Sequence, residues 1–382
     1  MGLIGLHSRK ISLWAFACAL FVACSERVAS IDNLLMYELK PNDITEEVSD
    51  LSGYISELEV VTLSKDSIAF KSINKLLVSN RYYIVLSGGV VFSVSIEDYN
   101  LIKIGDVGRG PGEYLSIKDI AISPDNKELW CLELYNSILR YDISDGAFLG
   151  KIEIPKNIGY AKAIVPLNPD EFGLYIPNPT SGFCLNFFNS DGKDLGSALD
   201  YKQYNFDMGF SIPVTVTDGN TYAISPESKM PSVVYRNGIP EMQLRFDFGN
   251  KNVPDKFYSV NQRDPWIYLD EIFKRDYYKH VSSVYFPNDD ICFRVFGEGS
   301  SSWNYYINEA RTHGIRWQSK GISAPPIHPI ASSGGYVFFP FEDYGYLTLE
   351  EEEDELKRIA LEKYGMPEQQ GMFIIKVRFD VK

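Results

Sequence analysis

Short runs in which apolar and polar residues alternate fill most of the chain, from about residue 58 to residue 381. The clearest series, 116–154, divides into runs at 116–123, 128–134, 137–143 and 148–154. Alternation with a period of two predicts β-strands that bury one face, and the Pro, Asn, Asp and Gly residues between the runs predict tight turns. Four short strands joined in this way form one antiparallel sheet, as in a propeller blade.

One local pattern recurs at a fixed interval. Tyr141, Phe188 and Tyr235 each end a strand-like run and precede an Asx-Gly turn, and successive aromatics lie 47 residues apart. A period of this length predicts a repeated supersecondary unit, and its strand content makes that unit a blade. The same division gives six blades, at 73–104, 116–154, 160–199, 211–248, 278–318 and 327–379.

The last of these units contains only three strand-like runs. An isolated run at 58–63 can supply the fourth strand, and this closure would remove the exposed sheet edges that an open ring leaves. The sequence therefore predicts an all-β fold over 57–382. It is a six-bladed β-propeller with four-stranded antiparallel blades, and its last blade is closed by an N-terminal strand.

Two insertions interrupt the pattern, at 249–277 and 347–365. The second predicts one helix at about 348–364, because Thr348 and Glu351 form a capping box and Gly365 ends the helical pattern. One side of this helix is expected to lie on the propeller. That side consists of Leu349, Leu356, Ile359, Ala360 and Lys363.

Residues 1–23 have the features of a lipoprotein signal peptide. A short basic segment precedes an apolar run at 11–23 that is too short to span a membrane comfortably. Small residues before Cys24 resemble a bacterial lipobox, in which this Cys is acylated and anchors the protein to a membrane. The alternative is an ordinary signal peptide with a chance Cys. Residues 24–56 are polar and irregular, and they are predicted to be a tether.

The composition fits this fold and limits the partners. Hydrophobic residues make up 45% of the chain and aromatic residues 14%, which is enough for a large β-rich core. The formal net charge of −14 argues against binding to nucleic acid, because nothing would neutralise the phosphates. Cys131, Cys184 and Cys292 lie in strand-like runs without metal-ligand spacing, so they are expected to be small buried hydrophobic residues.

A glycine-rich segment follows the first blade and reads GDVGRGPGEY from Gly105 to Tyr114. Its four Gly and one Pro predict a tight, rigid connection with positive-φ positions, Gly110 among them. The segment would join the outer strand of one blade to the inner strand of the next. It lacks the Lys-Ser/Thr pair and the following helix of a phosphate-binding loop.

This segment resembles the G-x-G-R-G-P-G-E-[FY] signature of the six-bladed β-propeller lipoproteins of Bacteroidota, which are relatives of the NHL-repeat propellers. The resemblance covers about residues 55–382. It implies a lipid-anchored protein of the cell envelope, at the outer membrane, on the periplasmic side or at the cell surface. Some members are encoded beside outer-membrane glycan-uptake systems, which implies a binding role with a glycan, a peptide or an uptake protein as partner.

Arg109, Glu113 and Tyr114 of the signature are candidate ligand-binding residues, because such connections lie on the propeller face that usually carries the binding site. Arg109 and Glu113 would then reach the central opening and contact a polar ligand. Alternatively, these two side chains pair with each other or cap backbone groups, and so hold the loop in shape.

Two histidines suggest a different kind of site. His280 and His328 lie on the predicted inner strands of adjacent blades, and inner strands line the channel. With an acid such as Asp119 they could bind a divalent metal in the central channel. NHL-like lyases use a site of this general kind.

Exposed aromatic residues could stack on sugar rings. Trp266, Tyr268 and Trp303 lie in or beside turns and insertions, where such a platform would be accessible. Core packing is the alternative for Trp266. Trp130 and Trp317 lie inside strands and are expected in the core.

The sequence contains neither a G-x-S-x-G nucleophile elbow nor a Cys in a basic, polar setting. The leading hypothesis is therefore a non-enzymatic binding or scaffolding lipoprotein for a glycan, a peptide or a partner protein, without a cofactor. The alternative is a channel-centred lyase or hydrolase that uses a metal. A third hypothesis is a purely structural partner of an outer-membrane complex.

Overall fold

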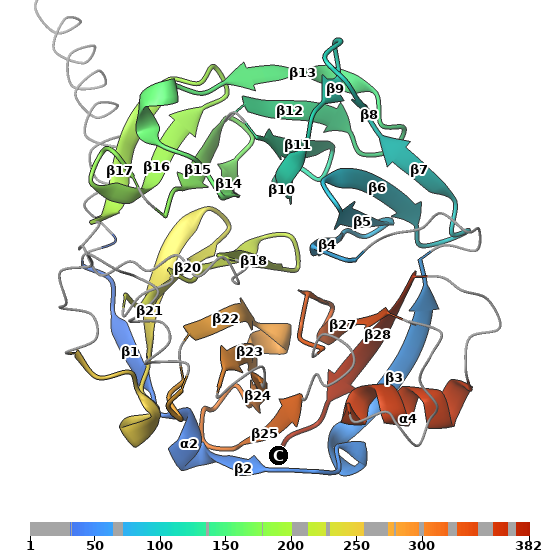
Figure 1. Ribbon diagram of the computed structural model, residues 1–382, viewed down its shortest axis with the longest axis vertical. Coiled ribbons are helices and arrows are strands. Elements are labelled where there is room, and N and C mark those ends of the chain that lie inside the picture. Colours follow the sequence, from blue (N-terminus) through green and yellow to red (C-terminus); the bar gives the residue numbers. More distant parts are fainter. Residues whose placement is uncertain are drawn as a thin grey trace, which may run out of the picture.

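Six blades radiate around a central axis in the computed structural model, with the first strand of each blade innermost (Figure 1). This arrangement confirms the predicted six-bladed propeller of four-stranded antiparallel blades. The structure describes residues 31, 33–63, 72–134, 137–177, 179–200, 213–226, 230–255, 274–278, 280–297, 302–319, 327–342, 354–365 and 372–382.

The first three blades are separate four-stranded antiparallel sheets. Blade 1 consists of β4 (Lys75–Val78), β5 (Tyr82–Ser87), β6 (Val90–Ser95) and β7 (Leu101–Ile104). Blade 2 consists of β10 (Ile117–Ile122), β11 (Glu128–Glu133), β12 (Ser137–Asp142) and β13 (Phe148–Glu153). Blade 3 consists of β14 (Ala163–Asn168), β15 (Glu171–Tyr175), β16 (Phe183–Asn189) and β17 (Asp194–Asp200).

The other three blades complete the ring. Blade 4 consists of β18 (Val214–Thr217), β19 (Thr221–Ile224), β20 (Ser232–Arg236) and β21 (Ile239–Phe246). Blade 5 consists of β22 (His280–Tyr285), β23 (Ile291–Phe296), β24 (Ser302–Ile307) and β25 (Gly314–Ser319). Blade 6 consists of β26 (Ala331–Ser333), β27 (Tyr336–Glu342), β28 (Met372–Phe379) and β3 (Ile55–Thr62).

The recurring turn that predicted the repeat has the backbone conformation that its sequence requires. In blade 4, Asn237 has a φ of 51° and Gly238 a φ of 74°, the positive values of a tight hairpin turn. Large side chains then fill the space between neighbouring blades. The rings of Trp130 in blade 2 and Phe172 in blade 3, for example, meet edge to face with centroids 5.9 Å apart.

Part of the segment predicted as a tether lies on the propeller. β1 (Met36–Leu39) pairs in parallel with β21 of blade 4, and β2 (Thr45–Glu47) pairs in parallel with β25 of blade 5. The helical turns α2 (Pro41–Ile44) and η1 (Ser52–Tyr54) follow these two strands.

The segment 24–56 is therefore not a simple tether, because a few of its apolar residues complete two cores between blades. Leu39 joins the cluster between blades 4 and 5, and Leu51, which is fully buried, joins the cluster between blades 5 and 6. Burial of these side chains stabilises a segment whose overall composition is polar.

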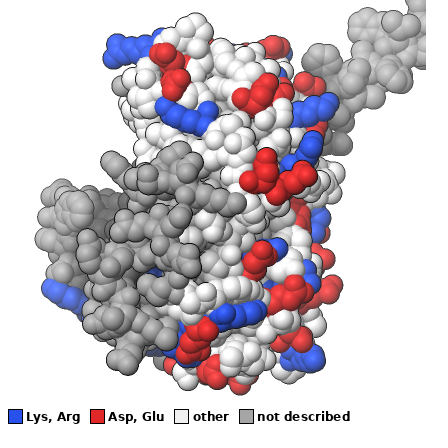
Figure 2. Space-filling model, turned by 90° about the vertical axis from the view of Figure 1, so that its right-hand side faces the viewer, with Lys and Arg blue, Asp and Glu red and all other residues white. Residues whose placement is uncertain are grey.

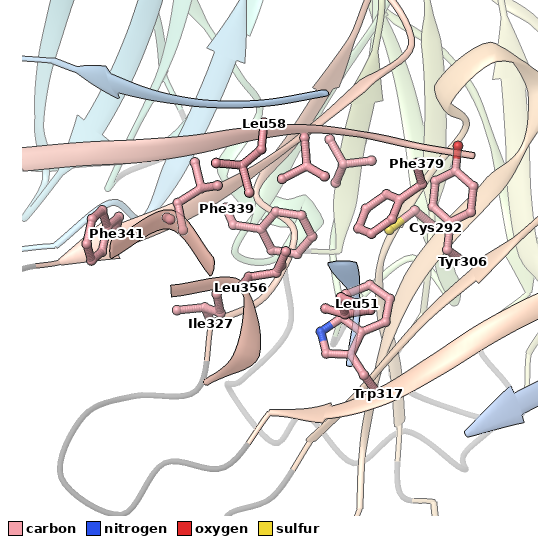
Figure 3. Packing of buried hydrophobic residues seen from close by; sticks show 14 of the residues in the cluster. Leu51, Leu58, Cys292, Tyr306, Trp317, Ile327, Phe339, Phe341, Leu356 and Phe379 are labelled. Carbon is pink, nitrogen blue, oxygen red and sulfur yellow. The ribbon is translucent and has the colours of Figure 1, made fainter. Parts of the chain in front are cut away.

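The ring closes where β3 pairs with β28 in antiparallel register, from Phe373 opposite Thr62 to Phe379 opposite Ile55. This pairing confirms the predicted closure by an N-terminal strand. Leu58 of β3 is buried in the same cluster as Phe339, on β27, and Trp317, on β25 (Figure 3). The closing strand therefore contributes to the core between blades 5 and 6 as well as to a hydrogen-bonded ladder.

The helix of the second insertion, α4 (Glu355–Tyr364), begins about seven residues later than the sequence predicted. Asp354 is its N-cap: the backbone of Asp354 is extended, and its carboxylate accepts hydrogen bonds from the amides of Leu356 and Lys357. The same carboxylate accepts a hydrogen bond of 2.5 Å from Ser319, which fixes the position of the cap. The predicted capping box of Thr348 and Glu351 lies outside the described residues.

The end of α4 and its packing face agree with the prediction. Gly365 ends the helix with a φ of 78°. Leu356 and Ala360 are fully buried in the cluster between blades 5 and 6. Lys363 and Tyr364 donate hydrogen bonds of 3.0 and 2.5 Å to the carbonyl oxygen of Leu58, so the helix also holds the closing strand.

Basic and acidic side chains are interspersed on the side of the molecule that Figure 2 shows. Ion pairs also join neighbouring strands of the propeller, for example Lys376 with Glu59 at 3.0 Å and Arg378 with Glu57 at 2.7 Å. Such exposed pairs contribute little to stability. Within the described part of the chain, no helix has the length and apolar character needed to cross a membrane.

The closure generates a prediction. We expect Leu58→Ala to reduce the free energy of unfolding by about 2–5 kcal/mol, because it leaves a cavity in the core beneath the closing strand. In the matched variant Glu59→Ala, which changes an exposed residue of the same strand, the loss should be about 0–1 kcal/mol. Urea unfolding measures both values. Equal losses would contradict the role assigned to Leu58 in the closure.

Candidate functional site

The glycine-rich signature forms a compact connection from blade 1 to blade 2. Its two short strands, β8 (Asp106–Val107) and β9 (Glu113–Tyr114), pair in parallel. Gly105 and Gly112 have φ values of 64° and 74°, so positive-φ positions are present as predicted. Gly110 does not have a positive φ, and the prediction is wrong for this residue. The bends at the two ends of the connection therefore depend on Gly105 and Gly112.

The side chains of the signature mainly hold this connection together. Tyr114 is fully buried, and its hydroxyl donates to the carbonyl of Ile104 at 2.9 Å and accepts from the amide of Val91 at 3.3 Å. The carboxylate of Glu113 accepts a hydrogen bond of 2.6 Å from the amide of Gly110. These bonds match the alternative in which the signature caps backbone groups.

Arg109 differs from its neighbours in the signature. Its side chain is exposed, and no described residue forms a hydrogen bond or an ion pair with it. Glu113 is not its partner, since that carboxylate caps the loop. Among the three candidates from the signature, Arg109 alone is exposed and uncommitted, whereas Tyr114 is enclosed in the core between the blades.

Asp119, the candidate third metal ligand, joins three blades. Its carboxylate, on β10 of blade 2, accepts a hydrogen bond of 2.7 Å from the ammonium of Lys75, on β4 of blade 1. Its other oxygen accepts a bond of 2.8 Å from the amide of Ile164, on β14 of blade 3. Asp119 and Lys75 are both buried, so this ion pair satisfies two charges that would otherwise be costly.

A different group of polar side chains lies on blade 5. The strand registers place Ser282, Arg294, Asn304 and Trp317 directly opposite one another, in one row across the sheet. A second row, two residues away on the same face, consists of His280, Phe296, Ser302 and Ser319.

This face of blade 5 is directed toward blade 6. The ring of Trp317 contacts Phe339, with centroids 6.3 Å apart, and the amide of Asn304 donates a bond of 3.3 Å to the carbonyl of Ile327. Ser319 donates to Asp354, the cap of α4. The face therefore lies between blade 5 and the parts of the chain that belong to blade 6.

Five polar atoms of this face are buried without a hydrogen-bond partner: His280 Nε2, Arg294 Nε, Ser302 Oγ, Asn304 Oδ1 and Trp317 Nε1. We call these five residues the blade 5 polar face. About nine in ten buried polar groups in proteins are paired, and an unpaired one costs on the order of 1–3 kcal/mol. Five on one face of one sheet make this face a candidate site for a polar molecule.

The electrostatics of this face are basic. Burial, reinforced by the charges of Lys162 and Arg294, lowers the pKa of His280 to about 4. Burial also lowers the pKa of Arg294 to about 10, so its guanidinium remains charged at neutral pH. His280 is therefore neutral at neutral pH, beside a buried cation.

The metal hypothesis finds little support in this geometry. Within the described residues, no three side chains of His, Cys, Asp or Glu lie together as a metal site. The charges around His280 are positive and would oppose a cation. His328 is half-buried just before β26, and Asp119 is engaged by Lys75.

The remaining candidates lie in different environments. Trp303 is part of β24, where it packs partly buried against the core between blades 4 and 5, and the guanidinium of Arg316 lies 5.7 Å from the centre of its ring. Trp130 and Trp317 are in the core, as predicted. Trp266 and Cys24 lie outside the described residues.

Two clefts lie at the other end of the strands. The first cleft has a volume of about 450 Å³, and its lining includes Tyr54, His313 and Lys382. The second has a volume of about 320 Å³, and its lining includes Tyr37 and Arg236. In the second cleft, Arg236 is already paired with acidic residues on both sides. Within the described residues, no buried unpaired atom belongs to a residue that lines either cleft, so the blade 5 polar face is the better candidate site.

The residues of this face were not recognised as a site from the sequence, except for His280. A signal was present: Arg294 interrupts the apolar run ICFRVF, and Ser302 and Asn304 occupy alternate positions in SWNYYI. Polar residues at positions that face a core suggest a buried polar network. The sequence alone does not show that the three strands place them side by side.

The fold is that of a β-propeller, and the blade 5 polar face is its candidate site. A family model described as 6-bladed beta-propeller matches residues 42–301, and the chain belongs to this family. None of the curated proteins compared with the chain matches it.

One of the similar solved structures shows the same fold. A protein from Bacteroides fragilis NCTC 9343, described as exported, is 14% identical with a TM-score of 0.67, and the match covers 91% of this chain and 99% of that one. The structure of U3-55K is 10% identical, with a TM-score of 0.40 and coverage of 84% and 98%. The RRP9 WD40 repeats are 8% identical, with a TM-score of 0.40 and coverage of 87% and 99%. The last two similarities are too low to support an argument.

The signature generates a prediction about two glycines. Gly112→Ala should reduce the free energy of unfolding by at least about 2 kcal/mol, because a side chain there is strained by the positive φ and its Cβ would lie 2.8 Å from Cβ of Phe148. Gly110→Ala should cost less than about 1 kcal/mol, because its φ is ordinary and its neighbour is the movable Glu113 carboxylate. Urea denaturation of both variants tests this order, and a larger loss at Gly110 would contradict it.

The buried histidine generates a prediction about pH. Between pH 6.5 and about 4 the unfolded chain binds a proton at His280 and the folded chain does not, so stability should fall as pH falls through this window. At pH 4 this difference in proton binding lowers the free energy of unfolding by about 3 kcal/mol. His280→Gln should remove it, whereas His313→Gln, at an exposed position, should retain the wild-type slope. Denaturation curves at several pH values measure this, and equal slopes for wild type and His280→Gln would contradict it.

Proposed function

We propose that the chain is a non-enzymatic binding or scaffolding module that holds a polar ligand at the blade 5 polar face. The observation that carries this proposal is the group of five buried atoms without hydrogen-bond partners. Arg294 and Trp317 offer donors, Asn304 offers an acceptor, and the hydroxyl of Ser302 can act as either. A glycan, a peptide or a segment of a partner protein presents matching groups of both kinds.

The proposed location is the cell envelope. The predicted signal peptide and lipobox support export and acylation at Cys24. The similar structure from Bacteroides fragilis, described as exported, supports the same compartment. We further propose that the lipid anchor attaches the protein to the outer membrane, beside an uptake protein that receives or delivers the ligand.

A matched pair of serines tests the proposed site. Ser302 and Ser319 are both fully buried and lie opposite each other on neighbouring strands, but only Ser319 has a hydrogen-bond partner. Thermal shifts are measured for the chain from residue 24 to residue 382 with neutral oligosaccharides, acidic oligosaccharides and short peptides. A ligand that binds the native state raises the melting temperature.

We expect Ser302→Ala to leave the ligand-free protein as stable as wild type, or up to about 1 kcal/mol more stable, because it removes an unpaired hydroxyl. The same variant should weaken ligand binding severalfold. Ser319→Ala should instead cost about 1–2 kcal/mol and retain binding, because its hydroxyl already has a partner. The proposal is wrong if none of the three ligand classes raises the melting temperature, or if the bound ligand is insensitive to Ser302→Ala.

A further inference from the structure

Four basic side chains lie at the same end of the strands, near the starts of the inner strands of blades 2, 3 and 5. Lys118 lies on β10 of blade 2, Lys162 immediately precedes β14 of blade 3, and His280 begins β22 of blade 5, while Arg294 is on the neighbouring β23. Burial lowers the pKa of both Lys118 and His280, and the positive charge of Lys162 lowers both further. In a chain of net charge −14, a cluster of this sign indicates a site for an anion.

Arg294 is the most important residue of this group because it is a buried cation. Only 7% of the residue is exposed, its Nε has no hydrogen-bond partner, and no described carboxylate forms an ion pair with it. Its guanidinium lies 4.2 Å from the centre of the Phe296 ring, which leaves the edge of the guanidinium plane for polar contacts. A buried charge without an opposite charge is costly, so a bound anion would stabilise this arrangement.

An anion alone could not pair all the polar groups around Arg294. Asn304 Oδ1 is a buried acceptor without a donor, and a carboxylate cannot satisfy it. The hydroxyl of Ser302 and the indole N–H of Trp317, on the same face, are also unpaired. Hydroxyl groups can donate to Asn304 and accept from Trp317, so the ligand should carry an acidic group and several hydroxyls together.

Lys118 adds an aromatic surface to the same cluster. Its ammonium lies 5.1 Å from the centre of the Tyr160 ring, and Tyr160 is 71% exposed. No described residue forms an ion pair with Lys118. An exposed ring beside a cation suits a sugar ring that carries a negative charge, because the ring offers apolar contact and the cation attracts the acid.

We infer that the blade 5 polar face binds a carboxylate-bearing sugar, with Arg294 on the carboxylate and Ser302, Asn304 and Trp317 on the hydroxyls. This inference rests on the function proposed above and names the ligand class for the same site. Arg294 is suited to this role because its planar N–H groups match the two oxygens of a carboxylate.

Calorimetric titration of the chain from residue 24 to residue 382 tests this. The probes are tetramers of galacturonate and mannuronate, the fully methyl-esterified tetramers, and a tetraglutamate peptide. The ester keeps the sugar hydroxyls and removes the charge. We expect at least one acidic tetramer to bind, its ester to bind at least tenfold more weakly, and the peptide to bind more weakly than the sugar.

Three variants test which basic side chains bind the carboxylate of the sugar. Arg294→Gln should weaken binding of the acidic tetramer at least tenfold, and Lys118→Gln should weaken it about threefold or more. Lys103→Gln, at an exposed lysine on β7 that pairs with Asp106, is the matched control and should bind as wild type does. If circular dichroism shows that Arg294→Gln is unfolded, the partly exposed Lys118 still provides the test.

The outcomes separate this inference from the function on which it rests. Equal binding of ester and acid, or wild-type affinity in the folded charge variants, overturns the assignment of a carboxylate and leaves the binding site in place. Stronger binding of tetraglutamate than of either sugar acid overturns the assignment of a sugar. If neutral glycans or uncharged peptides bind in a Ser302-dependent way and no acidic tetramer does, only the ligand class is wrong. If nothing binds, both fail.

Discussion

Closure of the ring is the constraint on which the rest of the structure depends. Each blade buries its faces against two neighbours, so a single missing strand would expose an edge and two cores at once. β3 supplies that strand from the opposite end of the chain, and α4 holds it through Leu58. Asp119 adds a second restraint, because its carboxylate joins the inner strands of blades 1, 2 and 3.

A ring restrained in this way can carry unpaired polar groups, and half of the buried unpaired side-chain atoms of the described residues belong to the blade 5 polar face. The blade 5 polar face is unfavourable by itself, but the large clusters on both sides of blade 5 hold its strands in register. Local groups that cost free energy persist when the surrounding structure determines their positions, and such groups are concentrated at functional sites. The paired Ser319, beside the unpaired Ser302, shows that the same sheet can satisfy a buried hydroxyl where Asp354 is near.

Local sequence patterns were sufficient for the blades and insufficient for the site. Alternation and Asx-Gly turns depend on residues close in sequence, so the strands, the hairpins and the need for a closing strand could be predicted. The start of α4 was predicted too early, because Asp354 is fixed by Ser319 from another blade. β1 and β2 were missed for the same reason, since their partners are distant strands. Arg294, Ser302 and Asn304 become neighbours only when β23 and β24 pair, which no local pattern shows.

The course of β1 along the outside of blade 4 also sets how the protein would sit on a membrane. Ile31, seven residues after Cys24, is already buried in the core between blades 3 and 4, and an extended chain of seven residues spans at most about 25 Å. An acyl chain on Cys24 would thus attach to the membrane through a short segment at the outer edge of the propeller and not at one end of its axis. The propeller would then lie near the bilayer by its outer edge, where β1 pairs with β21.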